Sequence, residues 1–328
     1  MAELARSASA YAQSYNPYSG TNYPNLHNVF IPEVWSGTLI EKFYAATVFG
    51  AIANTDYEGE IKTLGDTVKI RQVPDITISD YTLGAGITYE VPTKAVIELE
   101  VNKAKSFAFQ VNKVDEMQAD IDQMSKWAEA SSEELKVAVD SAVLAGMLGT
   151  AAAANRGADA GAITGGASGV GVDLGATTTP VAITEDNAIK FILRMGLVLD
   201  EQNVPETGRW VVIPARYAMN LKASDLKDAS ITGDGQSVLR NGRLGMIDRS
   251  EVFVSNQLPR GATSASLTGS EIAVYAGHKK GLTFASQILD TETLPNPADF
   301  GSLVRGLQVF GQKTVKPEAI AEGVVTCA

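Results

Sequence analysis

The fold is decided by Thr67-Val-Lys-Ile-Arg-Gln-Val73, Ile76-Thr-Ile-Ser-Asp-Tyr-Thr82 and the returning Ala95-Val-Ile-Glu-Leu-Glu-Val101. Polar and apolar residues alternate along these runs, which is the pattern of a β-strand with one buried face and one wet face. Gly84-Ala-Gly86 supplies a turn between the outgoing and the returning run. We therefore predict an extended β-hairpin over residues 56–111, with Ser106-Phe-Ala-Phe-Gln-Val111 completing the return. A long two-stranded hairpin is only marginally stable alone, so we expect it to lie on another surface.

Residues 113–148, directly after the hairpin, form the clearest helical pattern of the chain. Apolar side chains recur there at helical spacing, at Met117, Ile121, Met124, Ala128, Leu135, Ala138, Val139, Ala142 and Leu144. At ~1.5 Å per residue, about 35 residues span roughly 50 Å, about three times the usual length of a helix in a globular protein. The pattern predicts a long, rigid strut.

Two segments precede the hairpin. Residues 1–30 are rich in Ser, Ala, Asn, Tyr and Pro without an apolar period, and predict an extended arm whose tyrosines contact a neighbouring chain; a disordered tail is the alternative. Residues 31–55 place Pro32 at the first turn of a helical apolar pattern, which predicts a short amphipathic helix.

The second half of the chain has a different composition. Residues 149–183 are dense in Gly and Ala, which predicts a flexible or irregular loop at a boundary or insertion. Residues 184–328 then predict an α/β region. Helical patterns cover 188–199 and 217–226, and strand patterns cover 209–214, 250–255, 271–275 and 304–315.

Composition and charge exclude several classes of function. The net charge of -11 does not attract a phosphate backbone, which argues against nucleic-acid binding as the main role. The single cysteine, Cys327, cannot form an internal disulfide. The chain also lacks an apolar run of the roughly 18 residues that a membrane span needs, and its start lacks the pattern of a secretory signal, so we expect no membrane partner.

No catalytic, cofactor or metal site is predicted. The two histidines, His27 and His278, stand in none of the familiar nucleophile or zinc motifs. The glycine cluster at residues 165–171 lacks the strand, the helix and the Gly-Lys-Ser/Thr ending of a phosphate-binding loop. Acidic residues near the start of the long helix (Asp115, Glu116, Asp120 and Asp122) are explained by the helix dipole without an ion.

The order of these segments resembles the Hong Kong 97 fold of tailed-phage major capsid proteins, and several short words resemble its phage coat subgroup. They are Ile31-Pro-Glu-Val-Trp35, Asn54-Thr-Asp-Tyr-Glu-Gly-Glu60, Gly65-Asp-Thr-Val-Lys-Ile70, Phe107-Ala-Phe-Gln-Val-Asn-Lys-Val-Asp-Glu-Met-Gln118, Leu199-Asp-Glu-Gln-Asn-Val-Pro205, Arg209-Trp-Val-Val-Ile-Pro214 and Pro317-Glu-Ala319. The resemblance covers nearly everything from Ile31 onward.

The resemblance implies an α+β fold of the Hong Kong 97 type. Its parts would be an N-terminal arm (1–30), a short helix region (31–55), an extended β-hairpin loop (56–111), a peripheral domain with the spine helix and the Gly/Ala-rich loop (112–183), an α/β axial domain (184–305) and a strand returning to the peripheral domain (306–328).

The resemblance also implies a structural protein without enzymatic activity. Copies would assemble as pentamers and hexamers into an icosahedral head that encloses double-stranded DNA without reading its sequence, in a virion built in the bacterial cytoplasm. The implied partners are a portal, a separate scaffolding protein, since only about 30 residues precede Ile31, and a decoration protein. We expect contacts between subunits at Tyr11, Tyr15, Tyr18, Tyr23, Arg71, Tyr81, Tyr89 and Lys94.

Three other readings stay open at the level of the sequence. An encapsulin-like compartment would share the fold but enclose a protein cargo. An α/β enzyme would form only a small oligomer, and a surface-layer or tail protein would form sheets or tubes.

Overall fold

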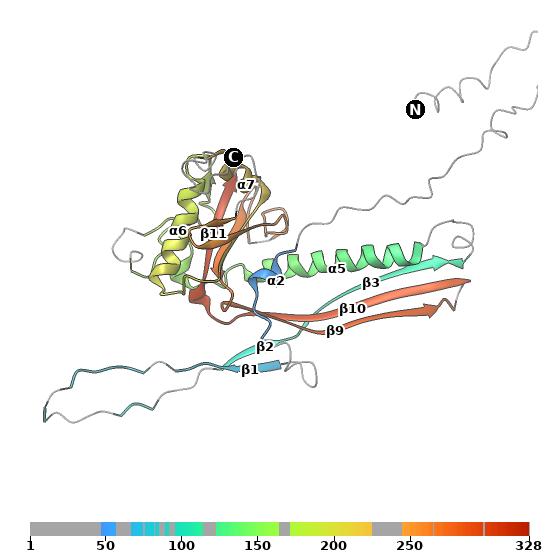
Figure 1. Ribbon diagram of the computed structural model, residues 1–328, viewed down its shortest axis with the longest axis horizontal. Coiled ribbons are helices and arrows are strands. Elements are labelled where there is room, and N and C mark those ends of the chain that lie inside the picture. The colour runs from blue at the N-terminus through green and yellow to red at the C-terminus, as the bar shows by residue number, and fades with distance from the viewer. Residues whose placement is uncertain are drawn as a thin grey trace, which may run out of the picture. The chain divides into compact units, whose positions relative to one another are not determined.

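The computed structural model describes residues 47–56, 67–74, 76–81, 83–84, 89–91, 96–113, 123–163, 171–224, 245–264, 266–297 and 299–327, all within the unit Lys42–Ala328. Figure 1 shows the arrangement of their helices and strands. The predicted arm (1–30), most of the predicted short helix region (31–55) and the acidic residues between 115 and 122 lie outside the described residues.

A six-stranded mixed sheet forms the centre of one part of this unit, in the order β4–β11–β8–β5–β7–β6. Its strands are β4 (Val181–Ile183), β11 (Ile320–Cys327), β8 (Ile272–His278), β5 (Arg209–Ile213), β7 (Ser250–Val254) and β6 (Met246–Ile247). All five residues of β5 are buried, because both faces of the sheet are covered.

The covering layers differ on the two faces. Val211 and Ile213 of β5 pack in a core with α6 (Ala188–Glu201) and α7 (Ala215–Ala223). The alternate residues, Trp210 and Val212, pack in a second core with Val143 and Leu144 of the long helix. Successive residues of β5 therefore point into different cores. Because both of its faces are buried, the strand needs apolar residues at consecutive positions.

A three-stranded antiparallel sheet lies against the long helix α5 (Gln123–Met147), as Figure 1 shows. Its order is β3 (Lys103–Asn112), β10 (Gly301–Thr314), β9 (Leu282–Pro295). The helix and sheet meet closely: Gln312 Nε2 of β10 donates to the carbonyl oxygen of Val143 at 3.0 Å, and Phe109 of β3 meets Trp127 of α5 edge-to-face at 6.1 Å.

One buried carboxylate fixes the segment before the hairpin onto this helix. Asp140 of α5 is fully buried, and its Oδ1 accepts hydrogen bonds from the backbone N–H groups of Val48 (3.0 Å) and Phe49 (2.9 Å) at the start of the short helix α2 (Phe49–Ile52). Burial raises the pKa of Asp140, and the two hydrogen bonds partly offset that rise. Asp140 therefore serves as a cap supplied from a distant part of the chain.

The predicted hairpin is present at its base. β1 (Thr67–Arg71) and β2 (Val96–Glu100) pair antiparallel, with Thr67 opposite Glu100 and Arg71 opposite Val96. The buried residues Ile70 and Leu99 pack with Ala285 and Val315, which belong to other elements of the chain. The base of the hairpin is thus anchored in a small core of its own.

The predicted return strand at 106–111 is wrong as part of the hairpin. These residues lie in β3 and pair with β10, with Ser106 opposite Leu307 and Val111 opposite Ser302. Alternation of polar and apolar residues predicts which side of a strand is buried, but it does not predict which strand lies beside it. The sequence therefore could not show that β2 pairs with β1 whereas β3 pairs with β10. The hairpin therefore ends near Glu100 and not at residue 111.

The described part of the Gly/Ala-rich stretch is irregular, which is one of the two predicted forms, and it is packed: Ala160 and Leu174 are fully buried in the helix-covered core, while 164–170 lie outside the described residues. Two further expectations are corrected. Residues 306–328 are not one returning strand, because β10 and β11 are separated by the 3-10 turn Pro317–Ala319 and join different sheets. β9, which the sequence prediction missed, lies in the three-stranded sheet although it falls within 184–305.

Phe310 of β10 belongs to the same core as Trp210 of β5 and Val143 of α5, so a substitution there measures how much this core stabilises the three-stranded sheet. It is fully buried and stacks near Phe284 of β9, with ring centroids 6.0 Å apart. We expect Phe310→Ala to lower the free energy of unfolding by about 3–5 kcal/mol, measured by urea unfolding of the isolated subunit. Phe300→Ala is the matched control, since that ring is exposed and its loss should leave the unfolding midpoint nearly unchanged.

Candidate assembly surfaces

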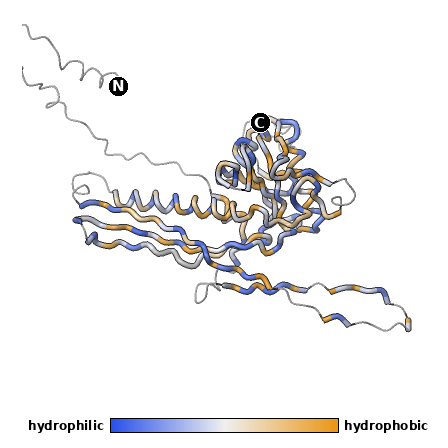
Figure 2. The backbone as a smooth tube through the Cα atoms, turned by 180° about the vertical axis from the view of Figure 1, so that it is seen from behind, coloured by the Kyte–Doolittle hydropathy of each residue, from blue (hydrophilic) through white to orange (hydrophobic). Residues whose placement is uncertain are grey.

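The distal part of the hairpin exposes a run of large apolar side chains. They are Val73, Ile76, Ile78, Tyr81, Leu83, Tyr89 and Val91, which we call the loop apolar set. Ile78 is 95% exposed, and Val73 is 92% exposed. Figure 2 shows apolar stretches recurring along this part of the chain. Monomeric soluble proteins seldom leave so many neighbouring apolar groups in water, so a surface of this kind marks an interface.

Among the described residues of this loop, the backbone is in no strand. Residues 76–81 and 89–91 form no ladder with each other in the described part of the loop, although the N–H of Thr77 donates to Glu90 Oε2 at 3.1 Å. Free N–H and C=O groups on an extended segment can pair with a strand of another chain. The exposed apolar side chains of the described part of the loop are therefore available to a partner.

The predicted contact residues divide into three groups. Tyr81 and Tyr89 lie in the loop apolar set, and Arg71 is exposed at the end of β1. Lys94 and the tyrosines of the arm (Tyr11, Tyr15, Tyr18 and Tyr23) lie outside the described residues. The prediction missed the aliphatic members of the set, such as Ile78. The alternating pattern of residues 76–82 could have predicted them, because the apolar face of a two-stranded hairpin stays exposed when no other layer covers it.

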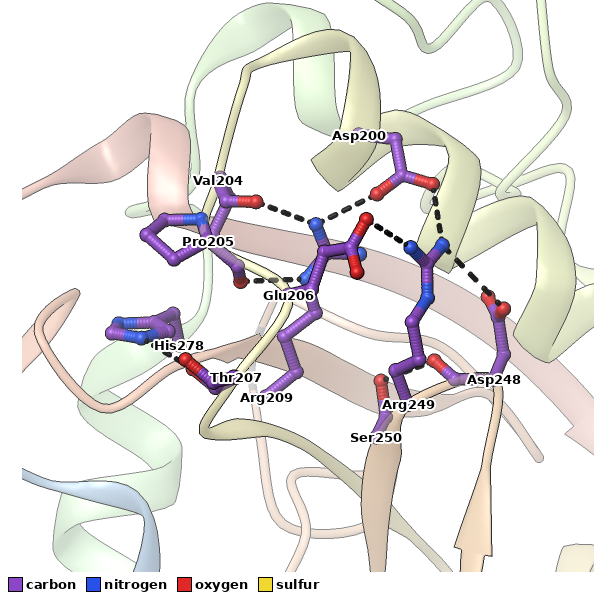
Figure 3. A network of polar contacts seen from close by, with 10 residues as sticks. All are labelled: Asp200, Val204, Pro205, Glu206, Thr207, Arg209, Asp248, Arg249, Ser250 and His278. Carbon is purple, nitrogen blue, oxygen red and sulfur yellow. Dashed lines mark hydrogen bonds and ion pairs between the residues drawn. The ribbon is translucent and has the colours of Figure 1, made fainter.

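A second feature is an ion-pair network at one end of the six-stranded sheet (Figure 3). The side chain of Arg209, at the start of β5, is fully buried. It donates to the carbonyl oxygens of Val204 (2.6 Å) and Pro205 (3.0 Å) and pairs with Asp200 Oδ1 at 2.7 Å. A guanidinium can satisfy several acceptors at fixed angles, so Arg209 fixes the turn between α6 and β5.

Arg249 joins the same network from the turn between β6 and β7. It pairs with Asp200 Oδ2 at 3.0 Å and with Glu206, and these two carboxylates raise its pKa. Arg249 and Asp248 both have positive φ, at 62° and 48°, a conformation that is costly for residues other than glycine. The ion pairs help to hold this tight turn against the end of α6.

His278 lies beside the network with both ring nitrogens bonded. Its Nδ1 accepts the N–H of Lys280 at 3.1 Å, so Nε2 carries the proton that it donates to the carbonyl oxygen of Thr207 at 2.9 Å. Burial lowers the pKa of His278, and Lys280, Arg209 and Lys316 lower it further, against the raising effect of the Thr207 bond. The fold therefore holds His278 as a neutral imidazole.

Among the described residues, no group of three or more His, Cys, Asp or Glu side chains is placed to hold a metal ion. Burial raises the pKa of the Cys327 thiol, which favours its unreactive protonated form. No helix in the described ranges is long and apolar enough to cross a membrane.

The buried arginine should matter more than its exposed neighbour. We expect Arg209→Ala to lower the free energy of unfolding by about 2–4 kcal/mol, because it leaves buried carbonyl oxygens without a donor and removes one of the two arginine partners of Asp200. Arg249→Ala should cost much less, since its pairs are exposed to solvent. Urea unfolding of the two variants compares them directly, and equal losses would contradict the assignment of Arg209 as the anchor.

The neutral state of His278 gives a prediction for pH. A histidine whose folded pKa lies below its ordinary value of 6.5 takes up more protons in the unfolded chain. Its stabilising contribution is therefore complete above pH 6.5 and is lost as the pH falls towards the folded pKa. We therefore expect the difference in free energy of unfolding between the unchanged protein and His278→Gln to shrink as the pH falls below about 6.5, measured by urea unfolding at a series of pH values.

Comparison with known proteins agrees with a structural role. The family model described as phage capsid protein matches residues 97–321, more than half of the chain. The structure from Mycobacterium phage Che8 is similar with a TM-score of 0.72 and 28% identity, over 89% of this chain and 96% of that chain. No match is found among curated protein sequences.

Two more distant structures share the fold. The capsid of the Cyanophage P-SCSP1u has a TM-score of 0.68 at 16% identity, over 96% of this chain and 97% of that one. The mature capsid of bacteriophage PhiM1 has a TM-score of 0.65 at 14% identity, over 96% and 99%. Because the family model matches residues 97–321, more than half of the chain, the chain belongs to the phage capsid protein family.

Proposed function

We propose that this chain, a major capsid protein that builds the head of a tailed-phage virion, uses the β1–β2 hairpin to grip a neighbouring subunit. The observation that carries the proposal is the loop apolar set, whose members from Val73 to Val91 are left in water by their own chain. Burying even half of that apolar surface contributes on the order of 5–10 kcal/mol before the loss of freedom on association is subtracted.

We assign the parts of the chain to a Hong Kong 97-type subunit. The extended loop corresponds to the hairpin, and the peripheral domain to α5 with the three-stranded sheet. The axial domain corresponds to the six-stranded sheet with α6 and α7. The order of elements along the chain supports this assignment, with residues 1–30 as the N-terminal arm.

A shell built in this way needs unlike surfaces on each subunit. A loop on one copy and a receiving surface on the next form a head-to-tail contact, which closes into rings of five or six. Each contact is modest, but many act together in a closed shell. The positive φ of Gly84, at 88°, allows the chain to turn at the described tip of the loop.

The remaining partners follow from the role in a head. We infer a portal, a separate scaffolding protein and a decoration protein, and no catalytic activity. Double-stranded DNA would be enclosed without sequence-specific contacts, which agrees with a net charge of -11. The match to phage capsid proteins favours a phage head over an encapsulin-like compartment.

Removing the distal hairpin tests the proposal. We expect deletion of residues 75–93 to leave a soluble subunit that forms no shells, because the anchored base of the hairpin stays and only the reaching part is lost. Electron microscopy and sedimentation measure particles, and circular dichroism checks folding. Normal particles from the deletion variant would refute the role of the hairpin.

A point substitution gives a sharper comparison. Ile78→Asp should reduce the yield of particles strongly, since it places a charge in the contact that the loop makes. Ile163→Asp is the matched control: Ile163 is 74% exposed in a different part of the chain. Equal effects of the two substitutions would show that the loss of particles reflects solubility rather than a contact made by the loop.

A further inference from the structure

A groove of about 670 Å³ lies between the base of the hairpin and one end of the six-stranded sheet. Residues 70–73 supply one wall, and residues 202–205 after α6 supply another. The segments around His278 and around Pro317 complete it. Gln72 Nε2 donates to the carbonyl oxygen of Val315 at 3.3 Å, and Ile70 packs with Val315 in the small core. These contacts hold the base of the hairpin against the segment around Val315, so the two walls of the groove are fixed to each other.

The groove combines an apolar floor with a basic rim. Ile70, Val204, Pro205, Val315 and Ala319 contribute the apolar lining, whereas Arg71, Lys280 and Lys316 contribute cationic groups. Glu318 is the acidic residue among those that line it. No salt bridge joins any of the three cationic side chains to another residue in the described ranges. The groove is therefore suited to an acidic segment that also carries apolar side chains.

The distal loop of the hairpin has this composition. Between Gln72 and Thr93 the sequence has three acidic residues (Asp75, Asp80 and Glu90) and no lysine or arginine. Its apolar members Ile78, Tyr81 and Val91 are exposed. Because they lie in water in their own chain, they do not fill the groove of that chain. The occupant with matching charge and matching apolar groups is thus the loop of another copy.

We infer that the basic groove receives the acidic, apolar loop (residues 76–91) of a second copy of this chain. The inference deepens the proposed function, on which it rests, by naming the surface that the hairpin grips. Opposite charges on the two surfaces favour the correct pairing and its rate of formation, while the apolar floor supplies the larger part of the contact energy. The same pairing repeated around a ring uses each groove and each loop once.

A charge swap tests the inference in the full-length protein. Lys280→Glu with Lys316→Glu reverses two charges of the rim, and Asp80→Lys with Glu90→Lys reverses two charges of the loop. Each pair alone places like charges together, and we expect it to raise the concentration needed for assembly by about tenfold or more. All four substitutions together restore opposite charges and should recover most of the assembly.

Lys279→Glu is the matched control, since Lys279 is exposed next to Lys280 but does not line the groove. It should assemble like the unchanged protein. Circular dichroism of each variant separates misfolding from failed contact. The inference is overturned if the two swapped pairs assemble normally, or if their combination is no better than either alone.

Two outcomes separate this inference from the proposed function. If deletion of residues 75–93 abolishes shells while the rim substitutions leave them intact, the hairpin grips another surface and only the groove assignment fails. If the rim variant assembles normally but packages less DNA, the groove holds phosphate groups of the genome instead of a loop. That result would also overturn the inference.

Discussion

Seven large apolar side chains between Val73 and Val91 lie exposed in the described part of the hairpin. A two-stranded hairpin buries its base against Ala285 and Val315 but has nothing of its own chain to cover Val73, Ile78 or Val91. The chain therefore carries an unsatisfied hydrophobic surface that only another molecule can remove from water. In a capsid, that other molecule is a second copy of the subunit, because copies of one subunit surround each other in the shell.

A loop that contacts a neighbouring subunit needs a base that is held in a fixed position. The small core around Ile70 and Leu99 connects the hairpin to β9, through Ala285, and to Val315 directly after β10. Beyond it, Gln312 joins the three-stranded sheet to α5, and Asp140 joins α5 to the segment around α2. The buried Arg209 similarly holds the turn into the central strand β5. The contacts of Gln312 and Asp140 connect segments that are far apart in the sequence, so the position of the hairpin depends on more of the fold than its own strands.

Sequence patterns predicted the elements better than their partners. The helix within 113–148, the buried strand at Arg209–Ile213 and the base of the hairpin could be recognised from periodicity alone. The pairing of β3 with β10 and the separation of β10 from β11 could not, because alternation is the same whichever strand lies alongside. The charge and apolar composition of the loop were visible in the sequence. The groove was not, since it combines residues near 72, 204, 279 and 316.

The most direct measurement is electron cryo-microscopy of the assembled head, traced through residues 67–100 of one subunit. We expect the loop to lie on a neighbouring subunit, with Ile78 and Tyr81 excluded from water in every copy of the shell. A map in which the loop of each copy folds back onto its own chain, or projects into solvent without a neighbour, would contradict a contact between the hairpin and the next subunit.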